Sequence, residues 1–306
     1  AGAVLTASPI NITSTSTGDQ TQPAIAWNGS KYLLAWSGSE TYASSSWDIR
    51  GCFLDTMLNP IGTSPMVISN AIEDQLRPSV ATNHSNFLVV WEDYRSAVSP
   101  NYFNDIYGAI ISSAGTVTPT SPAISLATGF QYAPRAACDG ANYFVVWEDH
   151  RGTGAAIYGT RVTSSGQVQD TSGISCPATS TYQVSPSICY GNAAYFITWA
   201  DSNKISGCRI NSSGSILDAK GITISSGSKP KSDPSAWWDG SKYQVVWEDY
   251  RSSDYANSDI YGTTVSSMGI PSTLPEMALV SDLAPQLKPC ILMSAGSGLL
   301  FYAKYI

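Results

Sequence analysis

Carboxylates with a guanidinium close by recur in one short motif, Trp-Glu-Asp-x-Arg, at residues 91–95, 147–151 and 247–251. Together with an acid such as Asp105 or Asp259 from across the following loop, these oxygen ligands could hold a calcium ion. The alternative is structural, with the Arg forked onto a carboxylate and the Asp capping loop N–H groups. We favour the structural interpretation, because a catalytic site is single whereas this motif recurs. The residues assigned to packing are Trp91, Asp93, Arg95, Trp147, Asp149, Arg151, Trp247, Asp249 and Arg251.

Other material for catalysis is sparse. The two histidines, His84 and His150, lie in different contexts, which argues against a histidine-based metal site or a catalytic triad. The sequence has no G-x-S-x-G, P-loop or G-x-G-x-x-G motif. Glycoside hydrolysis needs paired carboxylates, and the nearest one to a predicted channel-facing strand, Asp233, precedes its strand. We therefore expect no enzyme, no catalytic residue, no cofactor and no metal ion.

Basic residues near predicted strand starts and tryptophans in loops are the candidates for ligand binding. The basic residues could grip a carboxylate at the mouth of a channel, as the arginines of sialidases do, although the S-x-D-x-G-x-T-W repeat of that family is missing. The tryptophans could stack on sugars. The alternatives are ion pairing with adjacent loops and burial between sheets. The candidates are Arg77, Arg135, Lys231, Lys288, Trp47 and Trp237.

Repetition organises the whole chain and must position these residues. A Trp recurs about every 50 residues, and the Gly of an Ile-Tyr-Gly segment keeps step with it. Each unit holds a Pro-led strand, a turn such as Asp139-Gly140, and an apolar run such as 144–147 whose lack of alternation means that both faces are covered. The Ile-Tyr-Gly strand and a short final strand follow. The units span about 23–70, 78–127, 134–178, 186–226 and 234–281, with a partial sixth at 289–306.

Four short antiparallel strands with both faces buried are typical of a propeller blade, because such a sheet must stack on its neighbours around an axis. We predict an all-β, six-bladed β-propeller spanning 1–306 as a single domain, with a β-solenoid as the alternative. Residues 2–13 resemble 115–127, so this N-terminal strand is expected to complete the blade begun by 286–306.

The sixth unit has no Ile-Tyr-Gly strand. Either the last blade is three-stranded, or a strand from another molecule completes it, since an unpaired edge is a template for strand addition. Self-association or binding of a partner protein through this edge is therefore expected as one of two alternatives.

Composition narrows the setting and the partners. Charged residues make up 13% of the 306 residues, against about 25% in typical soluble proteins. The net charge is −7 and no basic cluster is present, which argues against nucleic acid, and no apolar run is long enough for membrane insertion. A start at Ala1 without Met suits a mature secreted chain. We expect an extracellular or cell-surface protein.

Two further features suit that location. The six cysteines show no C-x-x-C spacing, so disulfides are expected over a zinc site, with their pairing left open. Sequons that could carry glycans lie at Asn11, Asn28, Asn83 and Asn211.

The string V-V-W-E-D-x-R followed by D-I-Y-G resembles the TolB-like and surface-layer-type propeller repeats of secreted bacterial and archaeal proteins. That resemblance implies an extracellular scaffold without catalysis. The fourth unit departs from it with Ala200-Asp201-Ser202, and the first with Ser37-Gly38-Ser39. We expect a non-enzymatic structural or adhesion propeller, with self-assembly into a surface or filament as one form of it. The alternative is a lectin-like, carbohydrate-binding propeller, and the third hypothesis is a glycoside hydrolase or sialidase-like enzyme.

Overall fold

The computed structural model describes residues 11–12, 18–39, 46–97, 103–251, 257–273, 275–281, 285–294 and 297–304. These residues form 22 strands in six antiparallel sheets, which we number 1 to 6 in chain order. Sheet 1 holds β1 (Gln20–Trp27), β2 (Tyr32–Gly38), β3 (Asp48–Leu54) and β4 (Pro60–Ser69). Sheet 2 holds β5 (Gln75–Thr82), β6 (Asn86–Asp93), β7 (Asp105–Ser112) and β8 (Val117–Pro119). Sheet 3 holds β9 (Gln131–Cys138), β10 (Tyr143–Asp149), β11 (Ala156–Val162) and β12 (Ile174–Ser175).

The second half of the chain continues this pattern. Sheet 4 holds β13 (Val184–Gly191), β14 (Ala194–Asp201), β15 (Lys204–Asn211) and β16 (Ile222–Ser226). Sheet 5 holds β17 (Lys231–Trp238), β18 (Lys242–Asp249), β19 (Asp259–Ser266) and β20 (Met277–Val280). Sheet 6 holds β21 (Gln286–Ser294) and β22 (Ser297–Lys304). A helix with the length and hydropathy needed to cross a bilayer is absent from the described residues.

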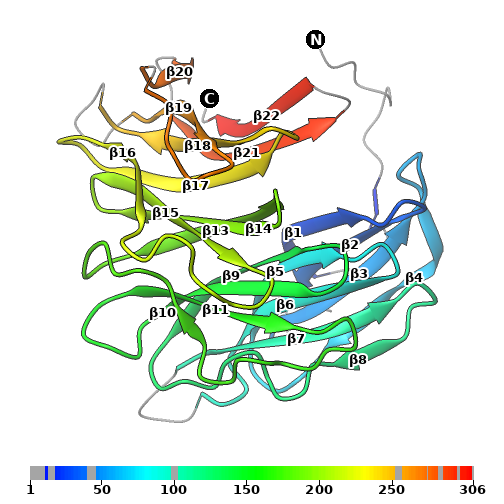
Figure 1. Cartoon of the computed structure of the whole chain (residues 1–306). Helices are drawn as coiled ribbons and strands as arrows, with labels where there is room; N and C mark the ends of the chain where they lie inside the picture. Colours follow the sequence, from blue (N-terminus) through cyan, green and yellow to red (C-terminus); the bar gives the residue numbers. More distant parts are fainter. Residues whose placement is uncertain are drawn as a thin grey trace.

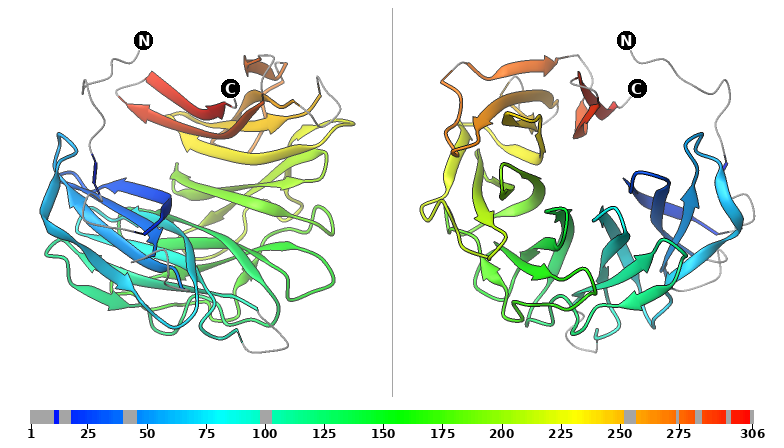
Figure 2. Two further views of the ribbon diagram at one scale, coloured as in Figure 1. Left: turned by 180° about the vertical axis from the view of Figure 1, so that it is seen from behind. Right: turned by 45° about the vertical axis from the view of Figure 1, so that its right-hand side comes forward.

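The sheets follow one another around an arc, as Figures 1 and 2 show, with sheets 1 and 6 at its two ends. The first strands of successive sheets contact each other in the order β1, β5, β9, β13, β17 and β21. They therefore form the inner side of the arc, and the later strands of each sheet lie outside them. This confirms the predicted all-β, propeller-type arrangement of four-stranded sheets. The predicted N-terminal strand, residues 2–13, falls almost entirely outside the described residues.

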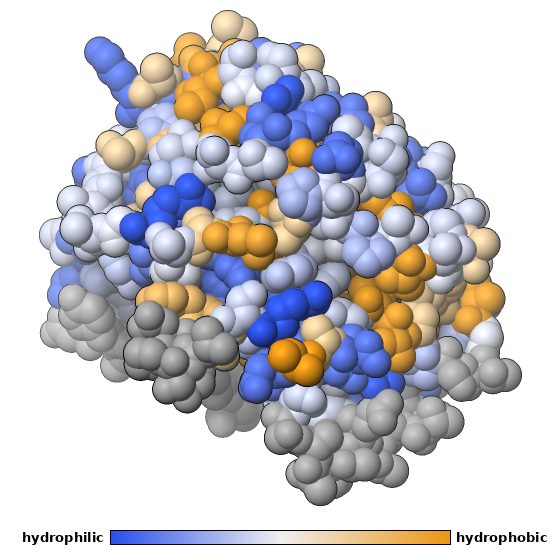
Figure 3. All heavy atoms as spheres, turned by 90° about the horizontal axis from the view of Figure 1, so that it is seen from below, coloured by the Kyte–Doolittle hydropathy of each residue, from blue (hydrophilic) through white to orange (hydrophobic). Residues whose placement is uncertain are grey.

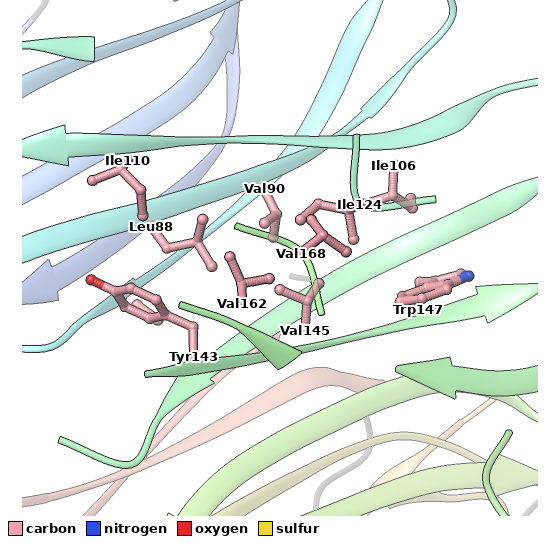
Figure 4. Close-up of a cluster of buried hydrophobic side chains, with 11 residues drawn as sticks. Leu88, Val90, Ile106, Ile110, Ile124, Tyr143, Val145, Trp147, Val162 and Val168 are labelled. Carbon is pink, nitrogen blue, oxygen red and sulfur yellow. The ribbon is translucent and has the colours of Figure 1, made fainter. Parts of the chain in front are cut away.

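The core lies between the sheets, because both faces of each second strand are covered. On β10, Tyr143, Val145 and Trp147 pack against Leu88 and Val90 of β6, as Figure 4 shows. The alternate residues Phe144 and Val146 pack against sheet 4 instead. Each such large apolar side chain contributes roughly 2–3 kcal/mol of burial free energy. The unbroken apolar runs in the sequence thus reflect sheets buried on both faces. Hydrophilic and hydrophobic residues are interspersed over the surface that Figure 3 shows.

The recurring Trp-Glu-Asp-x-Arg motif joins the end of the second strand of a sheet to the third strand of the same sheet. In sheet 3 the Trp147 Nε1–H donates to Asp149 Oδ2 at 2.7 Å, and Arg151 donates to both Asp149 oxygens at 2.8 and 2.7 Å. The guanidinium lies 4.0 Å from the ring centre of Tyr158, the Tyr of the Ile-Tyr-Gly strand. Sheets 2 and 5 repeat this geometry with Arg95 over Tyr107 and Arg251 over Tyr261.

Sheet 5 adds a second cation to this arrangement. The ammonium of Lys231, a buried residue at the start of β17, lies 3.1 Å from Asp249 Oδ2. Burial opposes ionisation of Asp249, but hydrogen bonds from Arg251, Trp247 and Lys231 outweigh it and lower the pKa to about 2. Asp249 is therefore an ionised, fully paired carboxylate in the core of the sheet.

Replacing Asp249 with Asn should destabilise the protein by roughly 2 kcal/mol at pH 7. Because the folded-state pKa of Asp249 lies below its unfolded value, its contribution is complete above about pH 4 and is lost as the pH falls toward 2. The difference between variant and wild type in urea unfolding should shrink over that interval. The matched control is Asp201→Asn, because Asp201 accepts a 3.4 Å hydrogen bond from Ser206 and pairs with no Arg in the described part of the chain. An equal loss in both variants would contradict this assignment.

Candidate functional site

A β-bulge interrupts the first strand of every sheet just before a Pro. The register shifts at this point in all six sheets, and the bulged residue has a positive φ between 44° and 54°. Such φ values are uncommon for residues with a side chain, and bulges re-aim side chains beside functional sites. The bulged residues are Gln22, Arg77, Ala133, Ser185, Asp233 and Lys288. Since the first strands line the inner side of the arc, these six residues form a ring that we call the bulge ring.

The Glu of the recurring motif holds the bulge of the next sheet. Glu92 of sheet 2 accepts a hydrogen bond from the Ala133 N–H at 2.7 Å, and Glu248 of sheet 5 accepts one from the Lys288 N–H at 2.6 Å. Glu148 does the same for Ser185 at 3.2 Å. Each carboxylate satisfies an N–H that the bulge removes from the strand ladder. Three of the six bulges are thereby held by a contact from the preceding sheet.

The backbone of the ring is repetitive, but its side chains differ at every position. The residue directly after each Pro also varies among the sheets. It is Arg135 in sheet 3, and in the other five sheets it is Ala24, Ser79, Ser187, Ser235 and Cys290. A packing motif repeats its side chains, whereas a binding site needs particular groups at particular places. The inner ring therefore has the asymmetry of a binding site on a symmetric scaffold.

Arg135 follows the bulge and the Pro of sheet 3. It is an exposed residue, although partial burial of its guanidinium by neighbouring protein groups lowers its pKa. The carboxylates of Asp233 in sheet 5 and Glu92 in sheet 2 act in the opposite direction. Its hydrogen bond within the described residues goes to the adjacent Pro134 carbonyl at 3.0 Å. A guanidinium has five N–H donors, so most of those of Arg135 are available to a ligand.

Glu248 differs from the other bulge-holding carboxylates in its charged neighbours. Glu92 has an ion pair with Arg77 at 3.0 Å, and Glu148 contacts His150 at 2.7 Å. Glu248 has no ion pair among the described residues; it accepts hydrogen bonds from the hydroxyls of Ser232 and Tyr250 at 2.8 and 3.2 Å. Its pKa is raised, first by burial and also by the neighbouring Asp233 carboxylate. These two acids form a pair in which Glu248 is driven toward its neutral form.

The structure separates the four basic residues that the sequence singled out. Arg77 and Arg135 lie in the inner ring, where Arg77 is paired with Glu92. Lys288 is an exposed member of the bulge ring. Lys231 is buried against Asp249 and is not available to a ligand. The expected cluster of four cations is therefore reduced to three.

Neither candidate tryptophan is an exposed stacking surface. Trp47 of sheet 1 and Trp237 of sheet 5 are both half-buried. The backbone of Trp47 is fixed by hydrogen bonds with Asp74 and Gln75. Trp237 lies on β17, opposite Gln244.

The sequons differ in accessibility. Asn28 is buried, and its Oδ1 accepts hydrogen bonds from the Ser30 and Lys31 N–H groups, which makes it a poor acceptor for a glycan. Asn83 and Asn211 hold similar turns but are half-buried, and Asn11 is exposed. Among the described residues, no group of three or more His, Cys, Asp or Glu side chains is arranged to hold a metal ion.

The carboxylate pair was missed at the sequence level because Glu248 belongs to a motif that recurs. A signal was nevertheless present. Aligning the units on their Pro places Arg77, Ala133, Ser185, Asp233 and Lys288 at one position, and only the fifth unit puts a carboxylate there. The informative feature was thus Asp233, which departs from the repeat next to Glu248, a residue that belongs to it.

No protein-family model and no curated protein matches this chain. Among solved structures, a protein of unknown function from Dyadobacter fermentans DSM 18053 is similar with a TM-score of 0.63 at 9% identity, over 96% of this chain and 93% of that one. An α-L-arabinofuranosidase from Lactobacillus brevis gives 0.49 at 13% identity, over 89% of this chain and all of that one. A thermostable family-43 glycoside hydrolase gives 0.47 at 12% identity, with the same coverage.

These comparisons correct two expectations. The neighbours are glycoside hydrolases and a protein of unknown function, so the expected resemblance to TolB-like and surface-layer repeats is wrong. The expectation of a non-enzymatic structural or adhesion propeller, inferred with that resemblance, is contradicted by the same neighbours and is not retained. At such low identities the likeness shows the fold alone, so any activity must be argued from the residues of this chain.

Substitutions at Arg135 and Arg151 should distinguish an arginine that is available for binding from one that is needed for packing. Replacing Arg135 with Met should leave the melting temperature within about 2 °C of the wild type, because the side chain is exposed and its hydrogen bond goes to the adjacent Pro134 carbonyl. Replacing Arg151 with Met should destabilise the protein by about 3 kcal/mol, because it leaves the buried Asp149 carboxylate without its cation. Calorimetry on both variants tests the distinction, and a similar fall in both would place Arg135 among the packing residues.

Proposed function

We propose that this propeller is a carbohydrate-active enzyme that hydrolyses a glycosidic bond at the bulge ring, with Glu248 as the proton donor and Asp233 as the second carboxylate. The observation that carries the proposal is the placement of two carboxylates together: Asp233 directly follows Ser232, which lies opposite Glu248, and Glu248 has no cationic partner among the described residues. The raised pKa of Glu248 supports it. The solved structures contribute the fold only.

Hydrolysis of a glycoside requires two carboxyl groups in different states. One must be protonated to donate to the leaving oxygen, and the other must be ionised to activate water or attack the sugar. Burial and the charge of Asp233 favour the neutral form of Glu248. The Asp233 side chain is half-buried and has no hydrogen bond to another described residue, so its oxygens are free to meet a substrate. The pair thus has the asymmetry that the reaction needs.

Arg135 supplies binding in this proposal. Its unused N–H donors match the hydroxyl and ring oxygens of a sugar, and Asp233 and Glu92 lie near enough to affect its charge. The positive φ of Asp233 fixes the direction of its side chain before any ligand arrives. Substrate would therefore meet preorganised groups from sheets 3 and 5.

The proposal includes a six-bladed ring closed by the N-terminal segment. Ile12 packs with Trp36, Cys52 and Leu54 of sheet 1. The alternate residues Leu33, Ala35 and Phe53 face sheet 2, so Ile12 covers the opposite face. In sheets 2 and 4 an outer residue, Ile124 or Ile224, covers the next sheet in the same manner. Ile12 therefore supports an outer strand that belongs to the blade begun by β21 and β22.

Assays with a panel of aryl glycosides and plant and microbial polysaccharides test the activity. Asp233→Asn should lower kcat at least 100-fold without loss of folding. Glu248→Gln should lower kcat strongly on polysaccharides and weakly on aryl glycosides, whose leaving groups need no proton. Glu148→Gln is the matched control, since Glu148 holds a bulge but has no carboxylate partner there, and it should retain activity. Absence of turnover on the whole panel, or binding without turnover, would overturn the enzymatic proposal; the second result would favour a lectin.

The pH dependence gives a separate test of the roles. The raised pKa of Glu248 keeps the acid protonated to higher pH than an ordinary Glu, so kcat/KM should fall only as the pH rises through this raised value. The Glu248→Gln variant should lose that basic limb. A wild-type profile whose basic limb survives in the variant would assign the proton donor to another group.

A further inference from the structure

Two buried thiols face each other at the boundary between sheets 3 and 4. Cys176 directly follows β12, where its N–H donates to the Ile157 carbonyl at 2.8 Å. Cys208 lies on β15, opposite Ile197. Both side chains are almost completely buried and belong to the same apolar cluster between the two sheets.

The two thiols interact within this cluster. A hydrogen bond between the Cys176 and Cys208 thiols, followed by burial, raises the pKa of Cys208 well above its usual range. Two thiols close enough to share a hydrogen bond need only a small side-chain adjustment to reach bonding distance. The arrangement is that of a reduced pair held in position for a cross-link.

The remaining cysteines have no comparable partner among the described residues. Cys52 lies on the outer face of sheet 1 and Cys189 between sheets 4 and 5. Cys138 packs at the boundary of sheets 2 and 3, and Cys290 is exposed on β21. All six thiols are free in this structure. Of the pairings that the sequence left open, the structure therefore singles out one.

We propose that Cys176 and Cys208 form a disulfide that joins sheets 3 and 4 when the chain folds in an oxidising compartment. One thiolate attacks a small-molecule disulfide such as oxidised glutathione and releases one reduced thiol. The second thiolate then displaces the other, so that the protein loses two protons and two electrons and two reduced thiols result. Because both groups are inaccessible in the folded core, the exchange takes place before sheets 3 and 4 pack.

The position of this pair matches a gap in the repeated packing. Sheet 4 is the unit with Ala200-Asp201-Ser202 in place of Glu-Asp-x-Arg, and its Trp199 donates to Thr179 rather than to an Asp. Thr179 belongs to the segment that follows Cys176. The disulfide would thus anchor, by a covalent bond, the same segment whose contact with Trp199 is a 3.2 Å hydrogen bond to Thr179.

Peptide mapping without reduction tests the pairing in full-length protein refolded with oxidised and reduced glutathione. We expect a Cys176–Cys208 peptide, four titratable thiols in denaturant, and a mass about 2 Da below that of the reduced chain. Six free thiols after refolding, or a different disulfide, would overturn the proposal.

Stability measurements give a second test of the disulfide, which includes the wild type and therefore does not depend on a variant that folds poorly. Reduction before heating should lower the melting temperature of the wild type by about 5 °C. Reduction should have no effect on Cys176→Ser/Cys208→Ser, whereas the control Cys138→Ser/Cys290→Ser should respond as the wild type does. A wild type that does not respond to reduction, although the peptide is cross-linked, would contradict the stabilising role. These readouts are independent of glycoside hydrolysis.

Discussion

The contact on which this structure depends is the hydrogen bond from a bulged N–H to the Glu carboxylate of the preceding sheet. A bulge on an inner strand leaves an N–H without a ladder partner, and a buried N–H without a partner costs free energy. Glu92, Glu148 and Glu248 satisfy these groups in the sheet that follows each of them. In sheet 1 the side chain of Gln22 does the equivalent for the Arg77 N–H at 2.9 Å. One type of contact thus joins sheet 1 to 2, sheet 2 to 3, sheet 3 to 4 and sheet 5 to 6, and it fixes the backbone of four bulged residues.

This arrangement separates what must be constant from what is free to vary. The bulge, the Pro and the carboxylate acceptor are needed for the sheets to fit together, so they recur. The side chain of the bulged residue takes no part in that contact, and it varies from Gln to Arg, Ala, Ser, Asp and Lys around the ring. A single pair of acids can therefore arise in one sheet without disturbing the packing of the others. Asp233 is such a residue, because its backbone follows the repeat and its side chain does not.

The sequence was sufficient to predict the repeat, the strand order and the covered faces, because each follows from local periodicity. Phe144 to Trp147 lacks alternation, and both faces of β10 are buried. The sequence was insufficient for contacts between sheets. Lys231 was grouped with Arg77 and Arg135 by its position near a strand start, but its direction is set by Asp249, which lies across the strand pair. The Lys288 N–H that donates to Glu248 and the Cys176 partner of Cys208 come from other units of the repeat, and a reading of one unit at a time does not bring them together.

Adjacent residues in sheet 5 show how the same fold supports two opposite electrostatic environments. Glu248 and Asp249 are neighbours in the chain, and their side chains leave β18 on opposite faces. Asp249 accepts hydrogen bonds from Arg251, Trp247 and Lys231, which lower its pKa to about 2. Burial and the carboxylate of Asp233 raise the pKa of Glu248, although the hydroxyl groups of Ser232 and Tyr250 donate hydrogen bonds to it. Lys231 contributes to this separation, since the equivalent positions of sheets 2, 3 and 4 carry Gln75, Gln131 and Gln183. Its charge is committed to Asp249 and so cannot neutralise Glu248. Glu248 is thus driven toward its neutral form while Asp249 stays an ionised packing group, and sheet 5 is where the repeat departs from packing alone.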